Sequence, residues 1–307
     1  MLEGGLSGYE EYGTDFNLLV SWASKLIVGG RDGVQEWLAG KKYILIDEYQ
    51  DFSQLFLAVV LAVRQVVPEV RLFVVGDDWQ AINRFAGSEV EYFKEFEHYF
   101  PVRCRRYEIT TNYRCDYEVV ETAKRFMRKA LSERGEFRAK SRRAGRVMLV
   151  DVRRTKTMYL EVLARLLREN RKAKEILLLH RNNETNLKIS LVGLKLALKQ
   201  EVVRVGVMSA EEFDAKVKVM TMHRSKGLEA EVVIILEADE GVIPKIHPDT
   251  ALYGVFGESE DVSFGDQVRL FYVAMTRAKK RLYILHDFSA GIGFVKYLGI
   301  GMEKWEE

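Results

Sequence analysis

Hydrophobic residues fall into short apolar runs of strand length that alternate with longer stretches of helical period. The apolar runs are typical of buried strands in a parallel sheet. The predicted strands are 43–46, 71–75, 146–150, 175–179, 217–220, 231–236 and 281–285, and the predicted helices are 16–28, 53–66, 90–99, 117–131, 157–170, 186–199 and 266–276. Ser53 is expected to cap the second helix. The alternation predicts an α/β fold with mainly parallel sheets.

Length and composition narrow the class of protein. The 307 residues are enough for two domains of ordinary size. The longest apolar run, 55–63, is far shorter than the roughly 20 residues that cross a bilayer. The first residues lack the basic start and apolar core of a secretory signal, so a cytoplasmic location is expected. Two cysteines, Cys104 and Cys115, exclude a disulfide framework or a cysteine-rich zinc module.

The formal net charge of +2 conceals an uneven distribution. Residues 1–60 contain nine acidic and four basic residues, a net charge of −5. Residues 124–146 contain ten basic and two acidic residues, a net charge of +8. A basic excess of this size suits a polyanion such as nucleic acid. A solvated helix face followed by a basic loop explains the same excess equally well.

Two carboxylates, Asp47 and Glu48, directly follow the predicted strand 43–46. Ligands of open α/β sheets bind beyond the carboxyl ends of the strands, which is where these residues lie. An aspartate there can hold Mg²⁺, and a following glutamate can activate a water that attacks a γ-phosphate. The simpler alternative is an acidic turn after a core strand.

The next predicted strand, 71–75, ends in Gly76, and Gln80 follows shortly after it. Glycine permits a sharp turn, and an amide beyond it can sense a phosphate or its attacking water. Phe85 is a candidate for stacking on bases of a single strand. A core position is the alternative for Phe85 and equally for Trp79.

Three further segments, 110–114, 219–229 and 269–279, place arginine or lysine in polar loops. The planar arginine fork matches phosphate oxygens and can stabilise charge on a transferring phosphoryl group. Each segment alone could instead form surface ion pairs. His223 alone is better explained as a structural histidine, because no nucleophile or metal ligand accompanies it in the sequence.

Taken in order, these segments resemble the motifs of the UvrD/Rep/PcrA-type superfamily 1 DNA helicases. Residues 47–51 (Asp-Glu-Tyr-Gln-Asp) resemble motif II, 76–87 motif III, 112–114 (Asn-Tyr-Arg) motif IV, 221–229 motif V and 272–279 motif VI. The resemblance implies two RecA-like P-loop NTPase lobes, the first incomplete. The expected domains are 1–108, with motifs II and III, and 109–307, with motifs IV to VI.

The same resemblance implies a role for each matching residue. Asp47 would bind Mg²⁺, Glu48 would activate water and Gln80 would sense the γ-phosphate of ATP. Arg114 and Arg277 would contact that phosphate from the second lobe, and Glu229 would contact the sugar side of the nucleotide. The residues implied for single-stranded DNA are Phe85, Thr221, His223, Arg224 and Lys226.

One part of the family pattern is missing. The only Gly-Lys pair is Gly40-Lys41, with Gln35 where the first glycine of the Walker A loop, G-x-x-x-x-G-K-[ST], should stand. Without that loop, ATP loses its main anchor. The strand that accompanies the loop is also missing, so strands 43–46 and 71–75 are expected to present an unpaired apolar edge.

Three hypotheses remain. The favoured one is the C-terminal portion of a split or truncated helicase, with little ATPase activity of its own, completed by an upstream polypeptide that carries the Walker A loop. The second is a catalytically inactive DNA-binding or regulatory module derived from a helicase. The third, a nuclease that uses Asp47, Glu48 and Asp51, is the weakest because no further acids and lysine complete a two-metal site.

Overall fold

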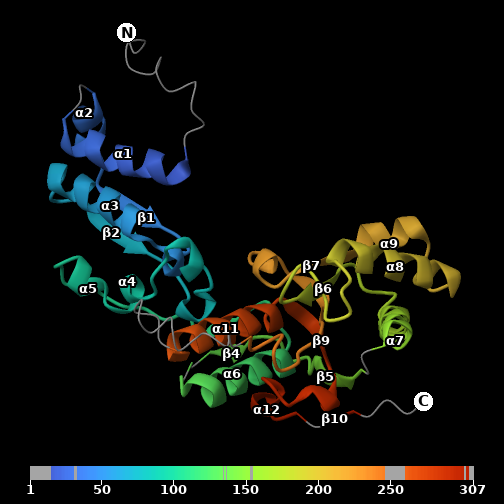
Figure 1. The fold of residues 1–307 in the computed structure, drawn as a ribbon. Coiled ribbons are helices and arrows are strands. Elements are labelled where there is room, and N and C mark those ends of the chain that lie inside the picture. The colour runs from blue at the N-terminus through green and yellow to red at the C-terminus, as the bar shows by residue number, and fades with distance from the viewer. Residues whose placement is uncertain are drawn as a thin grey trace, which may run out of the picture. The chain divides into compact units, whose positions relative to one another are not determined.

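The computed structural model describes residues 15–30, 33–133, 135, 137–152, 155–245, 260–300 and 302–303. Backbone proximity divides the chain into unit 1, Met1–Arg105, and unit 2, Arg106–Glu307. The sequence places the corresponding boundary after residue 108. Figure 1 labels the helices and strands of both units.

Unit 1 contains a two-stranded parallel sheet and a set of mostly short helices. Its elements are α1 (Phe16–Val28), α2 (Val34–Ala39), β1 (Tyr43–Ile46), η1 (Tyr49–Asp51), α3 (Gln54–Val66), β2 (Arg71–Val74), η2 (Asp78–Gln80), η3 (Arg84–Ala86), α4 (Glu91–Lys94) and α5 (Phe96–Tyr99). Helix α1 begins at Asp15, whose side chain accepts a hydrogen bond from the Asn17 amide at 3.3 Å. Helix α3 begins after Ser53, as predicted, although the Ser53 side chain makes no capping hydrogen bond.

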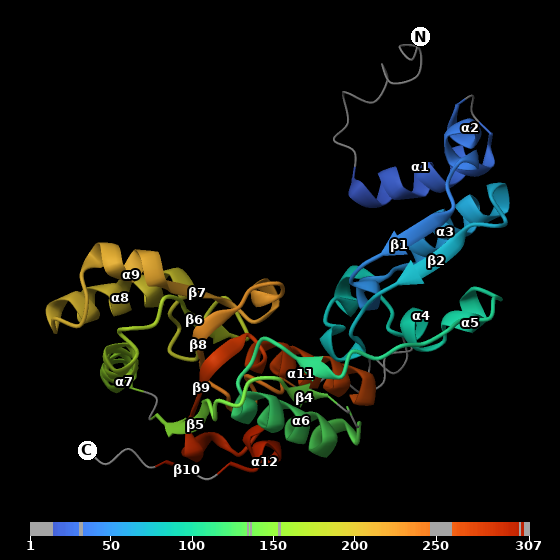
Figure 2. The ribbon, with the colours of Figure 1, turned by 180° about the vertical axis from the view of Figure 1, so that it is seen from behind.

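The two faces of the β1–β2 sheet differ sharply in burial. β1 and β2 lie side by side, with α3 next to them (Figure 2). On one face, Ile44, Ile46, Leu72 and Val74 pack against the core that includes Val60 of α3. The opposite face is apolar and exposed: Tyr43 56%, Leu45 73%, Phe73 59% and Val75 40%. Parallel sheets are normally covered on both faces, so this one is unusual.

Unit 2 is built on a larger parallel sheet with the strand order β10-β5-β9-β8-β6-β7. Its strands are β5 (Arg146–Asp151), β6 (Ile176–His180), β7 (Val217–Thr221), β8 (Ala230–Ile235), β9 (Ala278–His286) and β10 (Met302–Glu303). All neighbouring pairs of this sheet are parallel. A separate parallel pair joins β3 (Thr111–Asn112) to β4 (Arg138–Ala139). The predicted α/β class with mainly parallel sheets, as expected of RecA-like lobes, is confirmed.

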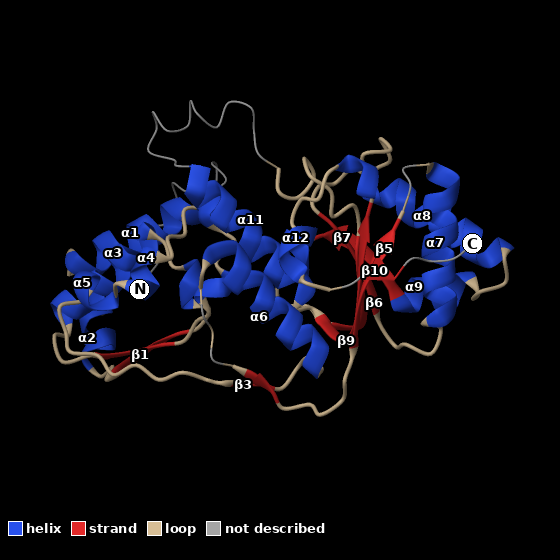
Figure 3. Cartoon of the chain, turned by 90° about the horizontal axis from the view of Figure 1, so that it is seen from below, coloured by secondary structure: helices blue, strands red, loops and turns tan. Residues whose placement is uncertain are grey.

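Helices cover both faces of the unit 2 sheet (Figure 3). Helices α7 (Lys156–Glu169), α8 (Leu191–Arg204) and α9 (Ala210–Lys216) supply one side, where Leu163, Leu198 and Phe213 are completely buried against strand residues such as Ile234. Helices α6 (Tyr117–Leu131), α11 (Glu260–Met275) and α12 (Val295–Leu298) supply the other. There Phe126 lies 5.1 Å from Phe271 and 5.4 Å from Phe294, measured between ring centroids. Burial on both sides explains why these strands read as continuous apolar runs.

Three of the predicted helices are wrong in extent, and the one predicted at 266–276 begins earlier, since α11 spans Glu260–Met275. The helix predicted at 186–199 begins at Leu191, because the Ser190 side chain accepts from the Gly193 amide at 3.1 Å and caps it there. It continues to Arg204, whose guanidinium pairs with Glu201 at 2.7 Å. The helix predicted at 90–99 is divided into α4 and α5 at Glu95, where the backbone leaves the helical region.

Among the residues that the model describes, no helix is both long enough and apolar enough to span a bilayer.

Candidate functional site

Asp47 and Glu48 lie at the carboxyl end of β1, and both are exposed. The Asp47 carboxylate accepts a hydrogen bond from the Glu48 amide at 2.8 Å, which fixes the turn after the strand. Glu48 has a φ of 50°, a left-handed conformation that is uncommon for a residue with a side chain. The turn therefore presents two carboxylates to solvent where a ligand of a parallel sheet would bind.

Gln80 lies on η2, just beyond the carboxyl end of the neighbouring strand β2. Its side-chain amide donates to the Asp77 carboxylate at 2.7 Å, and the Trp79 amide donates to the same carboxylate at 3.1 Å. Burial raises the pKa of Asp77, and these hydrogen bonds partly oppose the shift. Gln80 is therefore held in place before any ligand arrives.

One residue that sequence reasoning missed joins these two loops. Gln50 is completely buried, donates from its side-chain amide to Glu48, and accepts from the Asp77 amide at 2.9 Å. The signal that could have identified it is a polar residue two positions after Glu48, next to Tyr49, where the chain turns inward and both residues are buried.

Phe85 is 79% exposed and lies on η3, which ends at Gly87 in the left-handed conformation. Trp79 is only 7% exposed and belongs to the core of unit 1. The two aromatic residues, which sequence reasoning could not separate, thus differ completely in accessibility.

In unit 2, Arg114, Glu229 and Lys279 form a charged triad. Arg114 Nε lies 2.9 Å from one oxygen of Glu229, and Lys279 Nζ lies 2.5 Å from the other. Hydrogen bonding from Lys279, assisted by the charge of Arg114, lowers the pKa of Glu229. The Asn112 side chain accepts from the Arg114 amide at 3.0 Å, which fixes the start of this loop. Two predicted nucleotide contacts, Arg114 and Glu229, are therefore brought together, and Lys279 joins them.

Arg277 is only 1% exposed. Its Nε donates to the Val273 carbonyl at 2.9 Å, and its Nη1 donates to the Leu228 carbonyl at 3.2 Å. The guanidinium thus lies inside unit 2 and bonds to its backbone. Contact with a phosphate would require the remaining N–H groups of this buried guanidinium to become accessible.

The segment after β7 carries the remaining predicted residues. Thr221 is buried at the end of the strand, Arg224 is exposed on η4 (His223–Ser225), and Lys226 is half-buried. Burial, and secondarily the charge of Arg181, lowers the pKa of His223 to about 4. His223 is therefore neutral at pH 7 and can donate or accept a hydrogen bond without adding charge.

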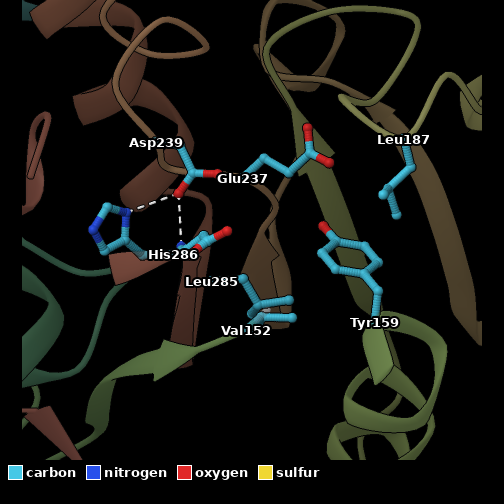
Figure 4. A pocket seen from close by; sticks show the side chains of 8 residues that line it. Val152, Tyr159, Leu187, Glu237, Asp239, Leu285 and His286 are labelled. Carbon is cyan, nitrogen blue, oxygen red and sulfur yellow. Dashed lines mark hydrogen bonds and ion pairs between the residues drawn. The ribbon is translucent and has the colours of Figure 1, made fainter. Parts of the chain in front are cut away.

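Two buried histidine–carboxylate pairs lie at the carboxyl ends of β6, β8 and β9. His180 is 3.0 Å from Glu237, and His286 is 2.8 Å from Asp239. Figure 4 shows Glu237, Asp239, His286 and Tyr159 around a small pocket. The Tyr159 hydroxyl is buried, and no hydrogen-bond partner for it lies among the residues that the structure describes. Sequence reasoning missed this cluster because its members are far apart in the chain: the histidines end β6 and β9, the carboxylates follow β8, and Tyr159 lies on α7.

Within the described parts of the chain, no group of three or more His, Cys, Asp or Glu side chains is arranged to hold a metal ion.

Comparisons with known proteins decide the family. Residues 8–101 match the UvrD/REP helicase N-terminal domain, and residues 207–287 match the UvrD-like helicase C-terminal domain. The chain is 30% identical to DNA helicase IV of Escherichia coli K12 over 303 residues, which cover 94% of this chain and 39% of that protein. The chain belongs to the UvrD-like helicases.

One more relative has a similar name, and one solved structure gives a weak overall match. A protein of Mycoplasma pneumoniae named "Probable DNA helicase" is 27% identical over 278 residues, covering 88% of this chain and 48% of that protein. The crystal structure of the C-terminal domain of a possible DNA helicase from Lactobacillus strain WCFS1 covers 61% of this chain and 92% of that one, at 12% identity. Its TM-score of 0.34 is too low to establish a shared fold.

This UvrD-like chain spans less than half the length of the two curated relatives. The N-terminal match includes Asp47, Glu48, Gln80 and Phe85, and the C-terminal match includes the residues from Thr221 to Glu229 and Arg277. Arg114 lies outside both matches. Family membership is thus established, while the role of each residue stays a prediction.

Proposed function

We propose that this chain is the C-terminal portion of a cytoplasmic ATP-dependent DNA helicase, which moves along single-stranded DNA once a segment with a Walker A loop completes it. The observation that carries the proposal is the arrangement after β1 and β2. The exposed Asp47 and Glu48 follow one strand, Gln80 follows its neighbour, and Gln50 joins the two loops. An acidic turn without a function would not need this link.

Unit 1 would supply the metal ligand and the water-activating group. Mg²⁺ is commonly held by one or two carboxylates together with phosphate oxygens, and the accessible Asp47 fits that requirement. The ion would neutralise charge on the phosphates of ATP. Glu48 would accept a proton from water, and Gln80 would hydrogen-bond near the γ-phosphate.

Unit 2 would supply cations and the contact to the sugar. Arg114 and Arg277 would stabilise charge on the phosphates, and Glu229 would accept from a sugar hydroxyl. Arg114 is already partly exposed, whereas Arg277 is buried and must first become accessible. Single-stranded DNA would stack on Phe85 and contact the segment with Thr221, His223, Arg224 and Lys226.

The bare face of the β1–β2 sheet supports completion by another segment. Tyr43, Leu45, Phe73 and Val75 expose apolar surface that a helix could cover. Within the described residues, β1 and β2 also pair only with each other. An upstream polypeptide with the phosphate loop, its strand and its helix could cover the apolar face with the helix and pair with the sheet edge through the strand.

The test is restoration of ATPase activity. The full chain alone should hydrolyse ATP negligibly, with or without single-stranded DNA. Coexpression with the polypeptide encoded immediately upstream of Met1 should give DNA-stimulated hydrolysis. Glu48→Gln should then abolish the restored rate, because the amide cannot accept the proton of water. Glu69→Gln makes the same chemical change at an exposed position after α3 and should leave the rate unchanged.

Two outcomes would overturn the proposal. One is DNA-stimulated ATPase activity of the isolated chain. The other is full activity of the complex that carries Glu48→Gln.

A second candidate function is a DNA-binding or regulatory module without ATPase activity. The burial of Arg277 favours it, as does the exposed basic surface at β4, where Lys140 lies over the ring of Tyr113 at 4.6 Å. This module would bind single-stranded DNA with an affinity that falls steeply as salt rises. Under either function, Phe85→Ala should weaken DNA binding by about 1–3 kcal/mol. Trp37→Ala, which removes another exposed aromatic of unit 1, serves as the control.

A further inference from the structure

A single buried amide spans the space between the two polar loops of unit 1. Gln50 has no exposed surface, yet both polar atoms of its side chain are used. Oε1 accepts from the Asp77 amide at 2.9 Å, and Nε2 donates to Glu48 Oε2. The orientation follows from chemistry, because the backbone N–H can only donate and an ionised carboxylate can only accept.

This contact depends on glycine at position 76. A Cβ atom built on Gly76 would lie 2.7 Å from Gln50 Oε1 and 3.1 Å from the Gln50 backbone nitrogen. Only a residue without a side chain therefore lets the end of β2 approach η1 this closely.

The hydrogen bonds continue from Asp77 to Gln80. The Asp77 backbone is held by Gln50, and its carboxylate accepts from the Gln80 side chain at 2.7 Å. At the other end of the chain of contacts, Glu48 adopts its left-handed φ of 50° with its carboxylate bound by the same Gln50. The groups predicted to activate water and to sense phosphate are thus separated by one buried side chain and one loop residue.

We propose that Gln50 is a positioning residue that couples Glu48 to Gln80, so that the two loops move together. The inference rests on the proposed function for the roles of Glu48 and Gln80, but the coupling itself belongs to unit 1 alone. When Gln80 turns toward a phosphate, Asp77 shifts with it, and Gln50 transmits the shift to the Glu48 carboxylate. Buried polar networks whose members are all satisfied are suited to such coupling.

Two substitutions in the full chain separate the two halves of the bridge. Gln50→Glu keeps an acceptor for the Asp77 amide but places a carboxylate against Glu48. Gln50→Leu removes both contacts. Gln65→Glu, the same chemical change at an exposed position of α3, is the matched control. Thermal unfolding and circular dichroism identify any variant that fails to fold.

Nuclear magnetic resonance gives the decisive measurements, and none of them needs nucleotide. In Gln50→Glu, the backbone and side-chain signals of Glu48 should shift, because the new carboxylate repels the neighbouring carboxylate of Glu48 instead of donating to it. In Gln50→Leu, protection of the Asp77 amide from hydrogen exchange should fall by up to about tenfold. The Gln80 side-chain amide signal should shift in Gln50→Leu although the two side chains share no contact. Gln65→Glu should change none of these.

Folded Gln50 variants in which both the Glu48 signals and the Gln80 signal match the wild type would overturn the coupling. If the coupling is present but the completed assembly hydrolyses no ATP, the proposed function fails and the coupling stands. If the assembly is active, Gln50→Glu should lower kcat more than it raises KM, because a displaced Glu48 affects the reaction step rather than binding.

Discussion

The two units place their predicted functional residues on very different scaffolds. In unit 2, a six-stranded parallel sheet is covered by helices on both faces, and Arg277 is buried within it. In unit 1, Asp47 and Glu48 are exposed at the end of a two-stranded sheet with one bare apolar face. The difference teaches that a complete scaffold can hide a functional group, whereas a sparse scaffold exposes the group and lacks support for it.

The largest expected effect compares the two sheets directly. Ile234→Ala in β8 should destabilise unit 2 by about 2–5 kcal/mol, because Ile234 has no exposed surface and its loss leaves a cavity. Leu45→Ala in β1 should change the stability of unit 1 by less than about 0.5 kcal/mol, because Leu45 is 73% exposed. Urea unfolding followed by hydrogen exchange resolves the two units. Equal losses would mean that the β1–β2 face is covered in solution.

A second contrast uses the functional residues themselves. Arg277→Ala should destabilise unit 2 by about 1–3 kcal/mol, because the Val273 and Leu228 carbonyls lose their donor. Asp47→Ala should be neutral within about 0.5 kcal/mol, because Asp47 is exposed. Thermal unfolding of both variants checks this, with Arg277→Lys as the control that keeps a charge. A neutral Arg277→Ala would show that the guanidinium spends its time outside unit 2.

The last contrast is a pH dependence of opposite sign in the two units. His223 has a pKa lowered from 6.5 to about 4, so the unfolded state binds more protons in that window and unit 2 loses stability as pH falls through it. Asp77 has a raised pKa, so unit 1 loses stability as pH rises from 3.8 through the folded value. His223→Asn and Asp77→Asn should each flatten the profile of their own unit. Unfolding midpoints measured from about pH 3.5 to about pH 7 include both windows and therefore test both signs.

The backbone was largely predictable where burial dictates the residue pattern. The strands of unit 2 lie between two layers of helices and are buried on both faces. Their sequences are therefore continuous apolar runs, which are easy to recognise as strands. The helix predicted at 186–199 failed because Ser190 caps α8 later than the apolar pattern suggests. Strands β3 and β4, with two residues each, carry too little pattern to be recognised.

The site was predictable as a set of residues and not as an arrangement. Resemblance indicated Arg114 and Glu229 separately, but their ion pair and the second partner, Lys279, depend on folding. The pattern around Arg277 could not reveal that its guanidinium binds backbone carbonyls inside the unit. Gln50 was overlooked since a glutamine in an acidic turn reads as a surface residue, whereas here it is fully buried.

The close approach of Gly76 to Gln50 also restricts the order in which this sequence can change. Any residue larger than glycine at position 76 meets Gln50 Oε1 and then the Gln50 backbone. A mutational path that alters Gly76 first therefore displaces the Gln50 side chain and breaks its contact with the Asp77 amide. A path that first shortens Gln50, as in Gln50→Ser, removes the nearer obstacle. Descendants of this chain should keep the two residues as a pair or lose the glutamine before the glycine.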